Sequence, residues 1–75
     1  MKLKYKSEKY DYELFEEPDG SLVISVVCGS IGIYEALMRL SNEELVRFRT
    51  EGTTYLDDLA TRIRKEESTF KSRFI

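Results

Sequence analysis

The residue types that most often carry chemistry are scarce in this chain. It contains no histidine, which is the usual general base near neutral pH, a common metal ligand and the partner of Ser and Cys nucleophiles. Its one cysteine, Cys28, ends an apolar segment, whereas a reactive thiolate needs a basic or helix N-terminal environment. We therefore interpret Cys28 as a packed or turn-adjacent residue, and we predict that the protein is not an enzyme.

Carboxylates occur in adjacent pairs, which on paper resemble the acid and base of a catalytic site. Neighbouring residues of a strand or helix point in different directions, so such pairs do not converge on one substrate or metal ion. We predict solvated and helix-capping roles for them, and no catalytic, cofactor-binding or metal-binding residues. The pairs are Glu16-Glu17, Glu43-Glu44, Asp57-Asp58 and Glu66-Glu67.

A GxxG motif covers residues 29–32, Gly29-Ser30-Ile31-Gly32. The same spacing occurs in the loop with which KH domains clamp a nucleic-acid backbone, but that loop lies between helices. Here the motif lies between two expected strands and has no basic residue inside it, which favours a β-turn with glycine at the strained positions.

Length and composition limit the remaining possibilities. A chain of 75 residues forms one domain with a thin core, so we predict a single domain over residues 1–75, with 1–9 and 68–75 as candidate loose ends. The net charge of -2 gives no global positive field that would steer the protein to a polyanion. One cysteine, no secretory signal pattern and no apolar segment of membrane-spanning length predict a cytoplasmic protein.

Three strands are expected before the first helix. Residues 10–16 alternate apolar and polar with period two, and Pro18-Asp19-Gly20 predicts a tight turn after them. Residues 22–28 are β-branched and apolar on both faces, as in a central strand. Residues 31–40 complete a three-stranded antiparallel meander. Residues 1–9 are compatible with either a short edge strand or a basic leader.

Two helices follow the strands. Ser41 and Glu44 have the spacing of a capping box, and Gly52 is the expected end of the first helix. The second helix is expected to begin at Thr53 or Thr54, whose hydroxyl can cap it, and its apolar positions are Leu56, Leu59, Ala60 and Ile63. The sequence thus predicts an α+β fold of order β-β-β-α-α, with both helices on one sheet face.

The other sheet face carries the functional expectation, because two short helices cannot cover both faces. Its predicted apolar residues are Val23, Val27, Ile33 and Leu37. Exposed apolar patches usually mark interfaces, so we expect a homodimer or a protein partner there; alternatively, Phe70, Phe74 and the N-terminal segment fold back over the face. The first expected strand adds acidic residues, including Asp11 and Glu13, and strand addition at its edge could recruit a basic protein.

Binding of single-stranded nucleic acid is the alternative function. Basic residues are concentrated near both termini, with aromatic residues between them. If the termini meet, these side chains form a basic stacking surface, although a solvated charged face is the more common outcome. The residues of this alternative site are Lys4, Lys6, Arg62, Arg64 and Phe70.

A pattern of residues across 22–63 resembles a set of short uncharacterised bacterial proteins. The shared features are a strand, a Cys-Gly turn, a Tyr-Glu strand, a Leu-x-x-Glu-Glu helix start and a glycine before a Leu-Ala helix. The resemblance implies the architecture and a bacterial origin, and by analogy with small acidic immunity proteins it suggests an immunity-like or regulatory interaction module. The matching residues are Cys28, Gly29, Tyr34, Glu35, Leu40, Glu43, Glu44, Gly52, Leu59 and Ala60.

Overall fold

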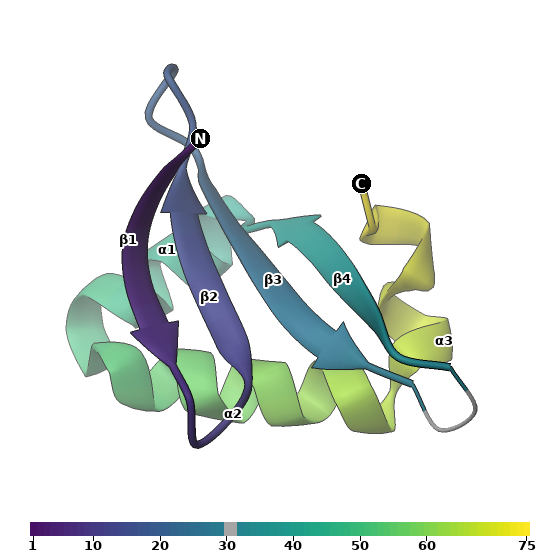
Figure 1. The fold of residues 1–75 in the computed structure, drawn as a ribbon. Helices are drawn as coiled ribbons and strands as arrows, with labels where there is room; N and C mark the ends of the chain where they lie inside the picture. Colours follow the sequence, from purple (N-terminus) through teal and green to yellow (C-terminus); the bar gives the residue numbers. More distant parts are fainter. Residues whose placement is uncertain (30–31) are drawn as a thin grey trace.

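The fold consists of an antiparallel sheet with helices on one side (Figure 1). The computed structural model describes residues 1–29 and 32–75. The strands follow one another in the sheet in chain order, β1-β2-β3-β4. The elements are β1 (Lys2–Ser7), β2 (Tyr12–Glu16), β3 (Leu22–Cys28), β4 (Tyr34–Arg39), α1 (Asn42–Glu51), α2 (Thr53–Lys65), α3 (Glu67–Phe70) and the 3-10 turn η1 (Lys71–Arg73). The predicted α+β class is confirmed.

The predicted number of strands is wrong, because β1 adds a fourth strand to the sheet. It pairs antiparallel with β2, from Lys2 opposite Glu16 to Ser7 opposite Tyr12, with an irregularity between Leu3 and Tyr5. Residues 2–6 are all exposed. An edge strand that buries almost nothing has no apolar face to reveal it, so its lysine-rich pattern could not separate a strand from a leader.

β2 forms one hairpin with β1 and another with β3, and the sequence predicted the turn of the second hairpin but not that of the first. The expected first strand is shorter than predicted: it begins at Tyr12, because residues 8–11 form a turn in which Asp11 adopts a φ of 51°. The turn expected at residues 18–20 is confirmed, since Gly20 N donates to Glu17 O at 2.9 Å with a φ of 91°. The central strand has the predicted bounds.

The connection between β3 and β4 is described only in part. Ser30 and Ile31 of the GxxG motif, where a turn was predicted, lie outside the described residues. The third expected strand, predicted over 31–40, is described as a strand from Tyr34 to Arg39.

The predicted cap at the start of α1 is confirmed, whereas the predicted cap at the start of α2 is wrong. At α1 the capping box is present: Ser41 Oγ accepts from Glu44 N at 3.3 Å, and Glu44 Oε1 accepts from Ser41 N at 2.7 Å. Gly52 ends α1, as predicted, with a φ of 70°. However, α2 has no side-chain cap. Because Gly52 both ends one helix and precedes the next, Thr53 is already helical and cannot serve as the predicted hydroxyl cap.

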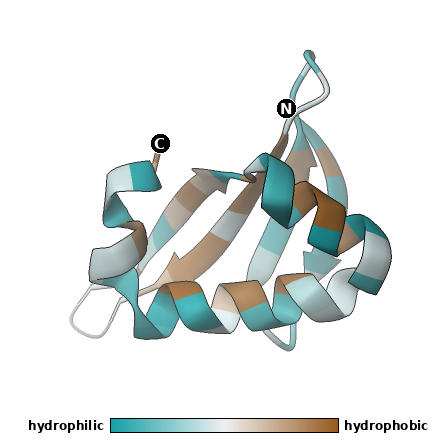
Figure 2. Cartoon of the chain, turned by 180° about the vertical axis from the view of Figure 1, so that it is seen from behind, coloured by the Kyte–Doolittle hydropathy of each residue, from teal (hydrophilic) through white to brown (hydrophobic). Residues whose placement is uncertain are grey.

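The core lies between the sheet and the helices. Figure 2, which views the domain from the helix side, shows α1 and α2 in front of the sheet. Tyr12 crosses this layer, and its hydroxyl donates to Asp57 Oδ1 at 2.7 Å. The predicted placement of both helices on one face is therefore correct. The buried residues of this layer are Tyr12, Leu14, Ile24, Val26, Cys28, Ala36, Met38, Leu40, Tyr55, Leu56, Leu59, Ala60, Ile63 and Phe70.

Residues after α3 fold back along the edge of the sheet. Phe74 forms an antiparallel bridge with Met38, and Ile75 N donates to Leu37 O at 2.7 Å. Phe74 packs against the core. The backbone of these residues therefore covers the outer edge of β4 at Leu37 and Met38.

Candidate functional site

The sheet face without helices, called the open face below, is the candidate site. Figure 1 shows this face in front of α1 and α2. Strand pairing places its side chains in rows that run across the sheet. One row is Leu3, Phe15, Val23 and Arg39, and the next is Lys6, Glu13, Ser25 and Leu37. A third row contains Val27 and Glu35, with Asp11 beside Val27.

One half of the open face is apolar. Leu3 is 49% exposed and Ile75 is 68% exposed, and Ile75 lies beside Leu37 through its backbone hydrogen bond. Phe15 and Leu37 are half-buried. These four residues, called the apolar half below, flank the central strand. Leu3 lies toward the β1 edge of the face and Ile75 toward the β4 edge, with Phe15 and Leu37 between them.

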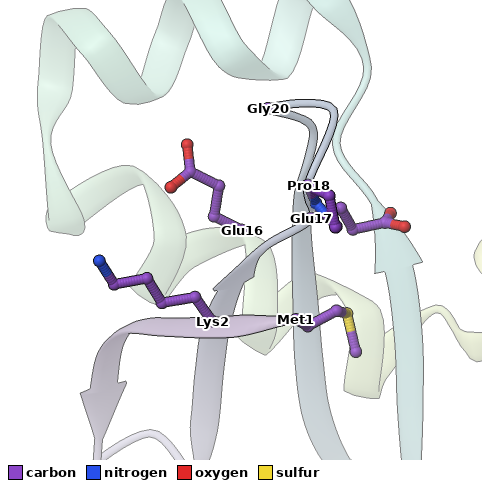
Figure 3. A pocket seen from close by; sticks show the side chains of 6 residues that line it. All are labelled: Met1, Lys2, Glu16, Glu17, Pro18 and Gly20. Carbon is purple, nitrogen blue, oxygen red and sulfur yellow. The ribbon is translucent and has the colours of Figure 1, made fainter.

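Val23 lies at the centre of this half but is completely buried, with 0% exposure. Its neighbours across the strands are Phe15 and Arg39. Arg39 Nε and Nη2 lie 3.0 and 2.6 Å from Glu17 Oε1, so the ion pair runs from β4 to the end of β2 above β3. Figure 3 shows the Glu17 side chain pointing toward β4. Val23 therefore packs beneath the surface of the open face, and its side chain is not exposed to a ligand as the prediction required.

The other half of the open face is acidic and slightly hollow. A depression of about 320 Å³ lies over Ser25 and Val27. Its rim includes carboxylates from β2, β4 and the β1–β2 turn, against one ammonium group, that of Lys6. We call Asp11, Glu13, Val27 and Glu35 the acidic half; Lys6, Ser7, Glu8, Tyr12 and Ser25 also line the depression.

The structure brings together some of the residues predicted for partner binding. Asp11, Glu13 and Val27 line the same depression, and Leu37 lies in the row beside it. Ile33 is 85% exposed but precedes β4 and lines a separate hollow near Gly29. The sequence analysis did not select Leu3, Phe15, Glu35 or Ile75. The alternation of residues 10–16 could have suggested Phe15, whereas no local pattern places Ile75.

The predicted strand addition at the acidic edge is wrong. The strand that carries Glu13 is β2, and it lies between β1 and β3, so it has no free edge. The alternative that the chain ends fold over the open face is also wrong. Phe70 and Phe74 pack with the core on the helix side, and the N-terminal segment lies in the plane of the sheet as β1.

The residues of the predicted nucleic-acid site do not converge. β1, with Lys4 and Lys6, is one edge strand of the sheet, whereas Phe74 covers the opposite edge, so the termini do not meet. Phe70 is only 6% exposed. Arg62 stacks over Phe70, with its guanidinium carbon 5.7 Å from the ring centroid.

Arg64 and Lys4 have structural contacts of their own. Arg64 donates to the backbone oxygens of Val27 at 2.7 Å and Asp11 at 2.8 Å, and also to that of Tyr10, so it ties α2 to the end of the sheet. Lys4 Nζ lies 3.5 Å from Glu16 Oε1. Both cations therefore have partners within the domain.

The surroundings of Cys28 disfavour the thiolate form that a nucleophile needs. The thiol is buried on the helix side, and burial, followed by the nearby Glu67 carboxylate, raises its pKa. Cys28 pairs with Tyr34 across β3 and β4. Within residues 1–29 and 32–75, no cluster of three or more His, Cys, Asp or Glu residues has the arrangement of a metal site.

A second hollow, beside the β2–β3 turn, also lacks convergent groups. Its volume is about 380 Å³, and Met1, Lys2, Glu16 and Glu17 line it together with Pro18 and Gly20. Figure 3 shows Lys2 and Glu16 extending to one side and Glu17 to the other. This arrangement provides no set of groups directed at one ligand.

Comparison with known proteins found no matching family model, no similar curated protein and no similar solved structure. Among the described residues, none of the helices has both the length and the apolar character needed to span a bilayer. The resemblance to short bacterial proteins thus stays a prediction, and the functional argument depends on the open face.

Proposed function

We propose that this chain is a non-enzymatic protein-interaction module that docks a protein partner on the open face. The observation that carries the proposal is the asymmetry of the sheet. Both large helices pack against one face, while on the other face Leu3 is about half exposed and Ile75 is mostly exposed. Exposed apolar side chains on a sheet face that no helix covers are a common mark of an interaction surface.

The two halves of the face define the partner's chemistry. The apolar half offers hydrocarbon surface for the dry centre of an interface, and polar groups commonly form the rim of such a contact. The acidic half offers carboxylates of Asp11, Glu13 and Glu35 around Val27. An arginine or lysine stem can lie on an aliphatic floor while its charge meets carboxylates. The partner is therefore a protein with an apolar surface next to basic residues.

A second copy of the chain fits the face less well. The open face carries five carboxylates, from Glu8, Asp11, Glu13, Glu17 and Glu35, against the cations of Lys6 and Arg39. Two such faces in contact would bring charges of the same sign together, which costs binding energy and disfavours the pairing. Charge complementarity instead favours a basic partner.

The size of the face predicts a modest interface. Four strands at a spacing of about 4.8 Å, each about 20 Å long, give a flat area of roughly 400 Å². A standard interface buries about 800 Å² on each partner. The open face alone therefore suits a small, reversible contact. An immunity-like or regulatory role, expected from the resemblance, is compatible with such a contact and stays a prediction.

A random-peptide library tests this proposal even though the natural partner is unidentified. Peptides selected on the wild-type domain are expected to be enriched in Arg or Lys together with apolar residues. Their binding should be lost on Glu35→Lys but retained on Asp58→Lys. Glu35 lies on the open face, whereas the matched control, Asp58, is an exposed carboxylate of α2.

An apolar pair of variants tests the other half of the face. Leu37→Asp should weaken the same peptides, whereas Val46→Asp, at a 59% exposed position of α1, should not. Peptides with no preference for basic residues, or insensitive to both open-face variants, would contradict the proposal. Light scattering supplies a further check, because a stable dimer that Leu37→Asp dissociates would assign the face to a second copy instead.

A further inference from the structure

The two edges of the sheet differ in their backbone pairing. The β4 edge is covered at Leu37 and Met38 by Phe74 and Ile75. Arg73 holds this cover in place, because its Nη1 and Nη2 lie 3.0 and 2.7 Å from the Glu44 carboxylate oxygens and Nη2 also donates to Arg39 O at 3.0 Å. The outer edge of β1, by contrast, pairs with no segment of the chain within residues 1–29 and 32–75.

The outer edge of β1 has the properties of a strand acceptor. The strand is six residues long, and its first five residues are all exposed. In an antiparallel sheet, alternate residues of an edge strand direct their N–H and C=O groups away from the sheet. These groups are a template on which another extended chain can pair.

The charge of this edge selects what can pair with it. Lys2, Lys4 and Lys6 alternate along β1, and Lys9 follows in the turn. Lys4 has an ion-pair partner in Glu16, but at 3.5 Å with both side chains more than a third exposed, so the pair is weak. Lysines on an edge strand prevent identical strands from pairing, and this repulsion disfavours a β1–β1 dimer. The same charges attract a strand rich in Glu or Asp.

We infer that the outer edge of β1 accepts an extended acidic segment of a partner protein by strand addition. This edge shares Leu3 and Lys6 with the open face, but it binds through backbone groups and has the opposite charge preference. The pairing register adds detail. Leu3 and Lys6 lie on the open-face side, across from Phe15 and Glu13, while Lys2 and Tyr5 lie on the helix side, across from Glu16 and Leu14. Each side therefore offers an apolar residue and at least one lysine.

A pair of synthetic peptides tests strand addition against simple charge attraction. The first is a ten-residue β-forming peptide of Glu, Val and Thr. The second has the same sequence with an N-methyl group on every residue, which keeps the charge and removes the N–H donors of both edges. At a peptide concentration of ten times Kd, the outward amides of β1 should exchange with solvent about tenfold more slowly than in the free protein. The methylated peptide should give no such protection.

Charge reversal provides the second measurement. The double variant K2E/K6E should lose the acidic peptide and gain a peptide in which Lys replaces Glu. The matched control, Arg49→Glu with Lys65→Glu on the helices, should keep the original preference. Equal binding of the methylated peptide, protection confined to β4, or no response to K2E/K6E would overturn the inference. Glu35→Lys should leave this binding intact, which separates a failure here from a failure of the open-face proposal.

Discussion

Glu44 takes part in both the cap of α1 and the ion pair with Arg73. Its removal gives the sharpest prediction about the stability of the domain. Its carboxylate accepts from Ser41 N, which completes the cap of α1, and binds the Arg73 guanidinium that positions the residues along β4. Loss of a helix cap costs about 1 kcal/mol. Loss of the charged pair adds roughly 1 kcal/mol rather than the larger value of a fully buried pair, because the Arg73 side chain is 36% exposed. Glu44→Ala should therefore destabilise the domain by about 2 kcal/mol.

Thermal unfolding followed by circular dichroism measures this effect. For a domain of this size, about 2 kcal/mol corresponds to a fall in Tm of roughly 8 to 16 °C. The matched control is Glu43→Ala, which removes an exposed carboxylate from the same helical turn and should change Tm little. If Glu44→Ala and Glu43→Ala behave alike, the assignment of Glu44 as a joint between α1 and the chain end is wrong.

The pH dependence of stability offers an independent check on Glu44. Burial raises the pKa of its carboxyl group, but hydrogen bonds from Arg73 and Ser41 outweigh burial, so the net pKa is lowered. A carboxylate whose pKa is lower in the folded state stabilises the fold above its ordinary pKa of 4.5 and loses this contribution as the pH falls through the folded value. Glu44→Gln should flatten that part of the stability profile, whereas Glu43→Gln should not.

Three further predictions concern the core and the helix junction. Leu59→Ala should cost on the order of 2 to 5 kcal/mol in denaturant unfolding, because Leu59 is fully buried under α2; little change would mean that α2 presents another face. Burial, then the hydrogen bond to Asp57, raises the pKa of Tyr12, so its contribution to stability is present below pH 10 and declines above it. Tyr12→Phe should therefore reduce the loss of stability measured between pH 10 and 11, and an unchanged loss would contradict this role. Gly52→Ala should lower stability by about 1 kcal/mol in urea unfolding, because alanine is strained at a φ of 70°; an unchanged midpoint would argue against that backbone conformation.

Segments that bury an apolar face were predictable from the sequence. The central strand, residues 22–28, has apolar residues on both faces, and the structure buries it at the centre of the sheet. The capping residues Ser41 and Glu44 marked the start of α1, because their spacing alone determines the hydrogen bonds they make. In these elements the local pattern and the tertiary structure agree.

Features that depend on distant partners were not predictable. β1 exposes nearly all of its residues, so only its pairing with β2 reveals it as a strand. This pairing also reverses the charge of the free edge, from the acidic residues of β2 to the lysines of β1. Val23 was assigned to the correct face, but its complete burial follows from Phe15, Arg39 and the ion pair to Glu17. The position of Ile75 depends on its backbone hydrogen bond to Leu37 and on the bridge between Phe74 and Met38, and these partners lie far apart in the sequence.

The most direct test of the central claim is to map where a selected peptide binds on the domain. Backbone amide chemical shifts of the labelled protein should change most along β3 and β4 when a basic, apolar library peptide is added. The residues expected to respond are Val27, Glu35 and Leu37, which belong to the open face. Shifts confined to α1 and α2, or a library that yields no peptide bound in this way, would contradict the proposal that the open face is a docking surface.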